Sequence, residues 1–206
     1  MRENWTKRDS VALGLLLALT PAFVFTSLGP GLFRWALKGL LIYFLAPTAI
    51  VWLLLRRSPR DFGIRLGNPR VFALSLLILP VAALMAYLAS KEPSFSSYYR
   101  EMLLTSGLDP LTYELVIGAG MLFCEAIYRG FHLFHMRRLM GTWSIAVQSI
   151  PYALAHAGKP TLELPYAYLA GVLFGYIDLK ANSILPSFVI HWLGSVFMDL
   201  FLLSSL

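Results

Sequence analysis

Glu125 and Arg129 stand four residues apart inside an apolar run from Leu111 to Phe134, which is long enough to cross a bilayer. On insertion scales, each such charged side chain costs roughly 2.5–3.5 kcal/mol at the centre of a membrane helix. Residues i and i+4 share one face of a helix, so the carboxylate and the guanidinium can neutralise each other. The pair is therefore either a buried ion pair that locks helices together or part of a functional site.

Two histidines in later apolar segments are candidates to join this carboxylate. His156 ends one segment, and His191 lies in the last one, followed after four and eight residues by Ser195 and Asp199 on roughly the same helix face. A lone histidine in a helix bundle usually has a structural role. Here, however, three neighbouring segments carry a glutamate, two histidines and an aspartate. If each had a separate structural role, the cost of desolvation would have to be offset separately four times, which favours a shared site.

The chemistry that these side chains support is hydrolysis. A desolvated carboxylate or neutral imidazole with a near-neutral pKa can take a proton from water. A second imidazole, whose tautomer a carboxylate fixes, can donate to the oxyanion that forms at a carbonyl. The chain lacks the His-Glu-x-x-His motif of zinc proteases, a Gly-Asp motif of the aspartyl type and a Gly-x-Ser-Gly motif of the rhomboid type. Of the classes of intramembrane protease, the one that uses a glutamate with histidines remains.

The chain that must position these residues is strongly apolar. Of its 206 residues, 58% are hydrophobic and 14% are charged, whereas soluble domains carry nearer a quarter of charged residues. The composition predicts an all-α fold, a polytopic transmembrane bundle of about seven to eight helices, in one domain over 1–206 with a catalytic-type core at about 111–204. The single cysteine, Cys124, excludes an internal disulfide, and no Cys/His cluster indicates structural zinc.

Hydropathy predicts seven spans, with a polar segment over 90–110 that lies along the membrane interface. The span over 143–157 is short for a full crossing. The predicted spans are 10–28, 33–55, 71–89, 111–138, 143–157, 164–179 and 184–203.

The net charge of +6 comes mostly from basic residues in short loops beside apolar runs, which is typical of orientation signals and excludes nucleic-acid binding. Most of these residues fall on the side of the N-terminus, so we expect a cytoplasmic N-terminus and an external C-terminus. His132 and His135 approach the same interface, where histidine is ordinary.

Three short motifs resemble the signatures of a known family, the CAAX-protease and bacteriocin-processing (CPBP, or ABI) intramembrane proteases. Those signatures are Glu-Glu-x-x-x-Arg, Phe-x-x-x-His, and a final His followed four residues later by Asn or a small residue. The resemblance is strongest from about 111 to 200, and the loop over 61–67 also looks like the family's loop before its core helices. The matching stretches, in the same order, are Cys124-Glu125-x-x-x-Arg129-Gly130, Tyr152-x-x-x-His156 and His191-x-x-x-Ser195.

The resemblance implies a multi-pass endopeptidase of a bacterial or archaeal cell membrane that cuts a membrane-anchored protein or peptide. Glu125 and His156 would activate a water, His191 would help to hold the oxyanion, and Arg129 would position Glu125. This mechanism needs no cofactor and no metal, although two histidines and a glutamate are also able to bind zinc.

Two positions depart from the family pattern. Cys124 replaces the first glutamate of the pair, and a shift of one residue turns a side chain by about 100° around a helix. The chain looks like a subset with a single glutamate that also has Gly-Lys-Pro after its second motif, here at 158–160, with an acid nearby such as Glu163. Ser195 stands where Asn is common, and Asp199 one turn on would take over the polar role. Cys124 as a nucleophile is the less favoured alternative, because a membrane-buried cysteine is usually inert.

Two other functions stay open. The missing first glutamate favours a non-catalytic scaffold, sorting factor or bacteriocin-immunity protein that keeps the family fold. A small transporter or proton relay is disfavoured, because the sequence shows no inverted repeat and no pair of broken helices.

Overall fold

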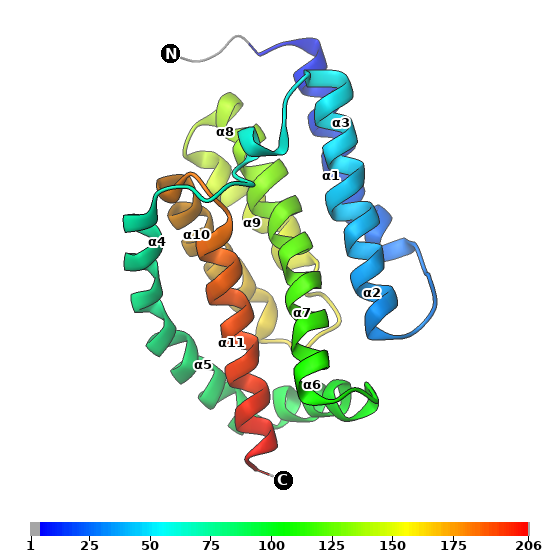
Figure 1. The fold of residues 1–206 in the computed structure, drawn as a ribbon, viewed down its shortest axis with the longest axis vertical. Coiled ribbons are helices and arrows are strands. Elements are labelled where there is room, and N and C mark those ends of the chain that lie inside the picture. The colour runs from blue at the N-terminus through cyan, green and yellow to red at the C-terminus, as the bar shows by residue number, and fades with distance from the viewer. Residues whose placement is uncertain (1–4, 206) are drawn as a thin grey trace.

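Every regular element in residues 5–205, the part of the chain that the computed structural model describes, is a helix (Figure 1). The all-α prediction is confirmed, and the elements join into eight continuous helices. Their bounds are α1 Lys7–Phe25; α2 Leu32–Gly39, η1 Leu40–Leu45 and α3 Ala46–Leu55 in one helix; η2, a 3-10 turn, Pro59–Phe62; α4 Pro69–Ser75, η3 Leu76–Ile78 and α5 Leu79–Lys91 in one helix; α6 Pro93–Thr105; α7 Pro110–Glu125, η4 Ala126–Phe134 and α8 His135–Met140 in one helix; α9 Trp143–Leu154; α10 Glu163–Ala181; and α11 Leu185–Leu203.

Five of these helices are long and apolar enough to cross a membrane, rather than the seven that the sequence predicts. They run over Lys7–Phe25, Leu32–Leu55, Pro69–Lys91, Pro110–Met140 and Leu185–Leu203. The helix α9 has 12 residues, about 18 Å at 1.5 Å per residue, which is short of a hydrocarbon core of about 30 Å. The helix α10 has 19 residues but is not among the five.

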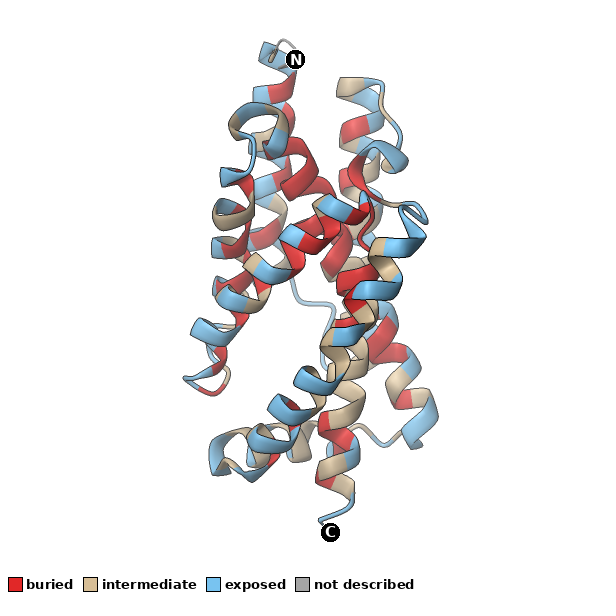
Figure 2. Cartoon of the chain, turned by 90° about the vertical axis from the view of Figure 1, so that its left-hand side faces the viewer, coloured by how far each residue is buried: buried red, intermediate tan, exposed pale blue. Residues whose placement is uncertain are grey.

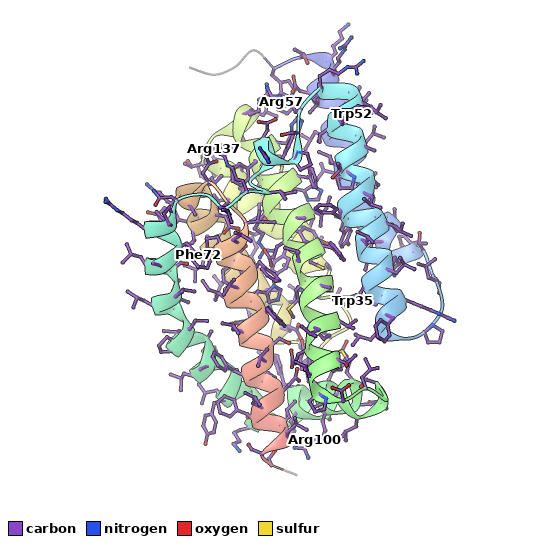
Figure 3. The ribbon with its side chains drawn as sticks, viewed as in Figure 1. Trp35, Trp52, Arg57, Phe72, Arg100 and Arg137 are labelled. Atoms are coloured by element: carbon purple, nitrogen blue, oxygen red, sulfur yellow. The ribbon has the colours of Figure 1, made fainter. Side chains whose placement is uncertain are left out.

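The segment between the third and fourth spans forms α6, which lies across one end of the bundle (Figure 1). The described chain starts at the opposite end and finishes, after α11, at the end where α6 lies. Arg57 and Arg137 lie toward the first end and Arg100 toward the second (Figure 3). The ends of the bundle therefore differ in the basic side chains that they carry.

The helix that carries Glu125 runs through the centre of the bundle. All nine residues of η4 are buried, and this segment contacts α1, α9 and α10. Figure 2 shows that buried residues gather in the middle of the molecule, whereas outward faces of the helices are exposed. Many of these exposed side chains are large and apolar, such as Leu74 and Leu77 on the third span, which suits contact with lipid.

Candidate active site

Glu125 is the last residue of α7, and its carboxylate joins two helices. The side chain is fully buried, and its Oε1 accepts a hydrogen bond from Nδ1 of His191 on α11 at 2.7 Å. Its Oε2 lies 3.3 Å from Nε of Arg129, so the ion pair expected from the spacing forms. The chain winds as a π-helix from Ala126 onward, a deviation that is frequent at functional sites.

Arg129 is held by aromatic rings as well as by Glu125. Its guanidinium carbon lies 3.6 Å from the ring centroid of Tyr152 on α9 and 5.5 Å from that of Phe174 on α10. A desolvated guanidinium over an aromatic face gains about 2 kcal/mol or more. The cation therefore ties the central helix to α9 and α10 while it neutralises the carboxylate.

Tyr152 is the point at which the three predicted motifs meet. The ring of His156 stands edge-on to it at 4.8 Å between centroids, and the ring of His191 at 6.2 Å. Sequence reasoning treated Tyr152 only as the first position of a motif and missed this role. A tyrosine four residues before a histidine was the available signal, since residues four apart stack on one helix face.

His156 lies in the turn that follows α9, two residues beyond its end and outside the five membrane-spanning helices. Its Nδ1 lies 2.9 Å from the backbone carbonyl oxygen of Tyr152, which can only accept, so Nδ1 carries a proton. Burial, and then the charge of Lys159, lower the pKa of His156. The imidazole is therefore neutral at pH 7, and its Nε2 is a proton acceptor.

A second buried carboxylate faces this imidazole. Glu163, the first residue of α10, places Oε1 3.8 Å from Nε2 of His156. The same oxygen accepts hydrogen bonds from the hydroxyl of Tyr99 on α6 at 2.7 Å and from Nζ of Lys159 at 2.9 Å. The sequence indicated Glu163 only as an acid near the Gly-Lys-Pro motif.

The other predicted residues lie around this centre. Cys124 is half-buried and packs against the main apolar core, and Ser195 is half-buried one turn beyond His191. Asp199 is buried and faces the carboxyl group of Glu114 on α7. Asp199 is thus next to another acid, at about 12 Å from His191 along the helix axis.

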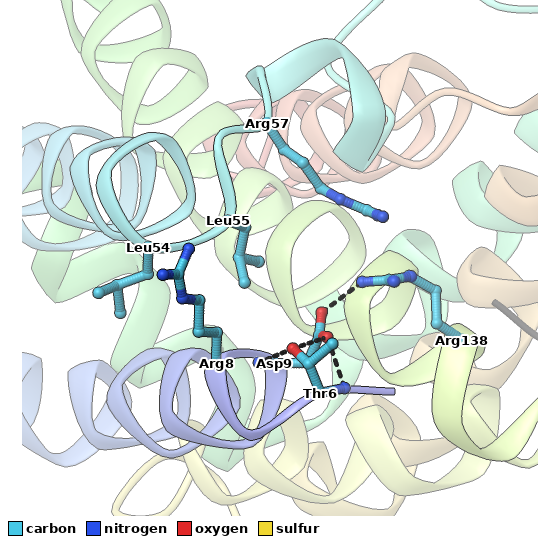
Figure 4. A pocket seen from close by; sticks show the side chains of 7 residues that line it. All are labelled: Thr6, Arg8, Asp9, Leu54, Leu55, Arg57 and Arg138. Atoms are coloured by element: carbon cyan, nitrogen blue, oxygen red, sulfur yellow. Dashed lines mark hydrogen bonds and ion pairs between the residues drawn. The ribbon is translucent and has the colours of Figure 1, made fainter. Parts of the chain in front are cut away.

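His132 and His135 are also fully buried and serve to hold α1. Their Nε2 atoms lie 2.9 Å from the backbone oxygens of Leu16 and Asp9, respectively. The carboxylate of Asp9 also binds Thr6 and Arg138, beside a cavity of about 310 Å³ (Figure 4). None of the predicted catalytic residues lines this cavity.

Among residues 5–205, no three His, Cys, Asp or Glu side chains form a group that could hold a metal ion. Glu125 and His191 form one pair and His156 and Glu163 another, and in each pair a carboxylate oxygen faces an imidazole nitrogen.

The segment that contains all four of these residues, 109–197, matches the family model described as type II CAAX prenyl endopeptidase Rce1-like. The match begins at the N-cap of α7, where Asp109 accepts a hydrogen bond from the backbone of Thr112, and ends within α11. This match confirms the resemblance to CAAX proteases and, with five candidate membrane helices, fits an integral membrane protease. No curated protein and no solved structure was found to match.

Proposed function

We propose that this protein is an intramembrane endopeptidase that hydrolyses a peptide bond in a membrane-anchored protein or peptide, through water activated by its glutamate and histidine side chains. The observation that carries the proposal is the convergence of Glu125, His156 and His191 around Arg129 and Tyr152. The family model's name points to prenylated CAAX peptides as the substrates to try first.

The family resemblance implies that Glu125 activates the water with His156, but its contacts favour a role through His191. Both carboxylate oxygens are engaged, one with Arg129 and one with His191, so Glu125 is a positioning residue for the imidazole. Because Nδ1 of His191 donates to the carboxylate, Nε2 is the ring nitrogen that remains available to a substrate. When the ring also carries a proton at Nε2, His191 donates from that atom to the oxyanion that forms at the scissile carbonyl.

His156 is the proton acceptor. Its neutral Nε2 takes a proton from water while the water oxygen bonds to the carbonyl carbon. The tetrahedral intermediate then expels the amine as the carbon–nitrogen bond breaks, and the proton passes from His156 to the leaving nitrogen. None of these steps requires a metal, so we expect cleavage to persist in the presence of a strong chelator.

The test is cleavage of a prenylated CAAX peptide by the purified protein in proteoliposomes, with products identified by mass spectrometry. We expect Glu125→Gln, His156→Ala and His191→Gln each to lower kcat by about 10²–10⁴-fold, the usual contribution of acid–base groups. Glu101→Gln, which alters an exposed acid on α6, is the matched control and should leave kcat unchanged. Melting temperatures in detergent separate lost chemistry from lost folding.

A non-catalytic scaffold is the alternative, and the complete burial of Glu125 between Arg129 and His191 favours it. In that case the pair only joins helices. Full biological activity of folded Glu125→Gln and His191→Gln proteins would support the scaffold and contradict the protease.

A further inference from the structure

Glu163 differs from the acid of an ordinary surface ion pair in its burial and in its hydrogen bonds. The residue is 6% exposed, although it begins a helix next to a loop. Its Oε1 accepts hydrogen bonds from Tyr99 and Lys159. Its Oε2 is buried and accepts none from the described part of the chain. A buried carboxylate oxygen without a donor is unfavourable, so a donor from outside the chain is expected there.

The atom that faces this carboxylate is itself an acceptor. Nδ1 of His156 donates to the carbonyl of Tyr152, which leaves Nε2 of the neutral ring with a lone pair. This lone pair lies 3.8 Å from Oε1 of Glu163, which, like the unpartnered Oε2 of the same carboxylate, has only lone pairs to offer. Neither group can satisfy the other. A molecule with two donor hydrogens, such as water, satisfies both.

We propose that Glu163 supplies a second carboxylate of the active site and, together with His156, holds the attacking water. This inference rests on the proposed peptidase function and assigns a new residue to it. The carboxylate comes from α10, whereas the paired glutamates of the family signature are adjacent on one helix. Glu163 would thereby supply the second carboxylate that is missing because Cys124 replaces the first glutamate of the signature.

The chemistry follows from the hydrogen bonds. A water that donates one hydrogen to Nε2 of His156 and the other to Glu163 directs its oxygen lone pairs away from both groups, toward a substrate carbonyl. As the oxygen bonds to the carbonyl carbon, its proton moves to Nε2, and Glu163 stabilises the imidazolium that forms. The proton then leaves with the amine nitrogen, and both groups return to their starting state.

A purely structural role for Glu163 is the competing explanation, because its bond to Tyr99 also ties α10 to α6. The two roles predict different effects of Tyr99→Phe on cleavage. If Glu163 only holds α6 through this hydrogen bond, Tyr99→Phe removes the bond and should cost at least as much as Glu163→Gln, whose amide oxygen can still accept it. If Glu163 holds the water, Tyr99→Phe keeps the carboxylate and should cost far less.

The kinetic experiment compares these two variants and Glu163→Asp on the prenylated CAAX peptide. We expect Glu163→Gln to lower kcat at least 100-fold with KM changed less than threefold, Tyr99→Phe to lower kcat less than tenfold, and Glu163→Asp to recover part of the loss. Glu101→Gln again serves as the control. If Glu163→Gln stays within threefold of the unmodified protein while His156→Ala is inactive, the inference is wrong and the proposed function stands.

A second measurement does not depend on cleavage. In protein labelled with ¹⁵N-histidine, we expect Glu163→Gln to move the Nε2 resonance of His156, because an amide can donate directly to Nε2. The Nε2 resonance of His132, bound to the backbone of α1, should stay in place. An unchanged His156 resonance would overturn the inference, whether or not the protein cleaves the peptide. A shifted His156 resonance in a protein that cleaves no peptide would count against the proposed function alone.

Discussion

Arg129 illustrates how a full charge is kept inside an apolar bundle. Its guanidinium is completely buried, and it lies between one carboxylate and two aromatic faces rather than in water. The planar, weakly hydrated guanidinium can stack and form an ion pair at once, which a lysine ammonium cannot. The position thus requires arginine in particular, and not merely a positive charge.

Replacing this cation should be costly in a specific way. Arg129→Met leaves the carboxylate of Glu125 buried without its cation and bonded only to His191, so we expect a destabilisation of about 3–5 kcal/mol. Denaturation of the detergent-solubilised protein measures this loss. The double variant Glu125→Gln with Arg129→Met removes both charges and should recover most of the stability, whereas additive losses would show that the two residues are not coupled.

At the scale of elements, the π-helical segment η4 brings the central helix against the loop that precedes the third span. A Cβ at Gly130 would lie 3.1 Å from the backbone oxygen of Phe62. The next residue of that loop, Gly63, accepts a hydrogen bond from the backbone of Ile184 just before α11. The two adjacent residues of the first motif thus have different roles: Arg129 neutralises a carboxylate, and Gly130 leaves room for the backbone of the loop.

Gly130→Ala tests the steric role of this glycine. Alanine favours a helix by about 1 kcal/mol over glycine, but overpacking costs about 1–3 kcal/mol, so we expect a net loss of roughly 1 kcal/mol. For a chain of this size, that loss corresponds to a fall of about 2–4 °C in Tm. Gly14→Ala on α1 is the matched control, because nothing lies within 4 Å of its added Cβ, and it should not lower Tm.

At the scale of the whole molecule, the two ends of the bundle are chemically different. Arg57 and Arg137 lie toward one end. The other end carries Arg100 and the amphipathic α6. This difference is the asymmetry that orients membrane proteins, and it favours the arginine-rich end on the cytoplasmic side.

Labelling of single cysteines checks this orientation. In a Cys124→Ser background, we expect Lys91→Cys to react with an impermeant maleimide added outside intact cells, and Arg60→Cys to react only after the membrane is opened; both positions are exposed. The reverse labelling pattern would place the N-terminus outside and contradict the charge argument.

The sequence by itself determined the helical class, indicated a membrane location and supplied the candidate residues of the site. These follow from local quantities: the length of apolar runs, the cost of a charge in lipid, and the i, i+4 spacing that pairs Glu125 with Arg129. It predicted seven spans where five helices are long and apolar enough to cross a membrane, in part because hydropathy does not reveal that α9 stops two residues before His156.

Only the tertiary structure decided which groups meet. Tyr99, Tyr152 and Glu163 come from α6, α9 and α10, and no spacing along the chain relates them to His191. Their contacts arise from helix packing, in which long-range neighbours are set by how side chains from different helices fit together. The hydrogen bonds then fix the tautomer of each imidazole, and with it the atom of each histidine that can take part in chemistry.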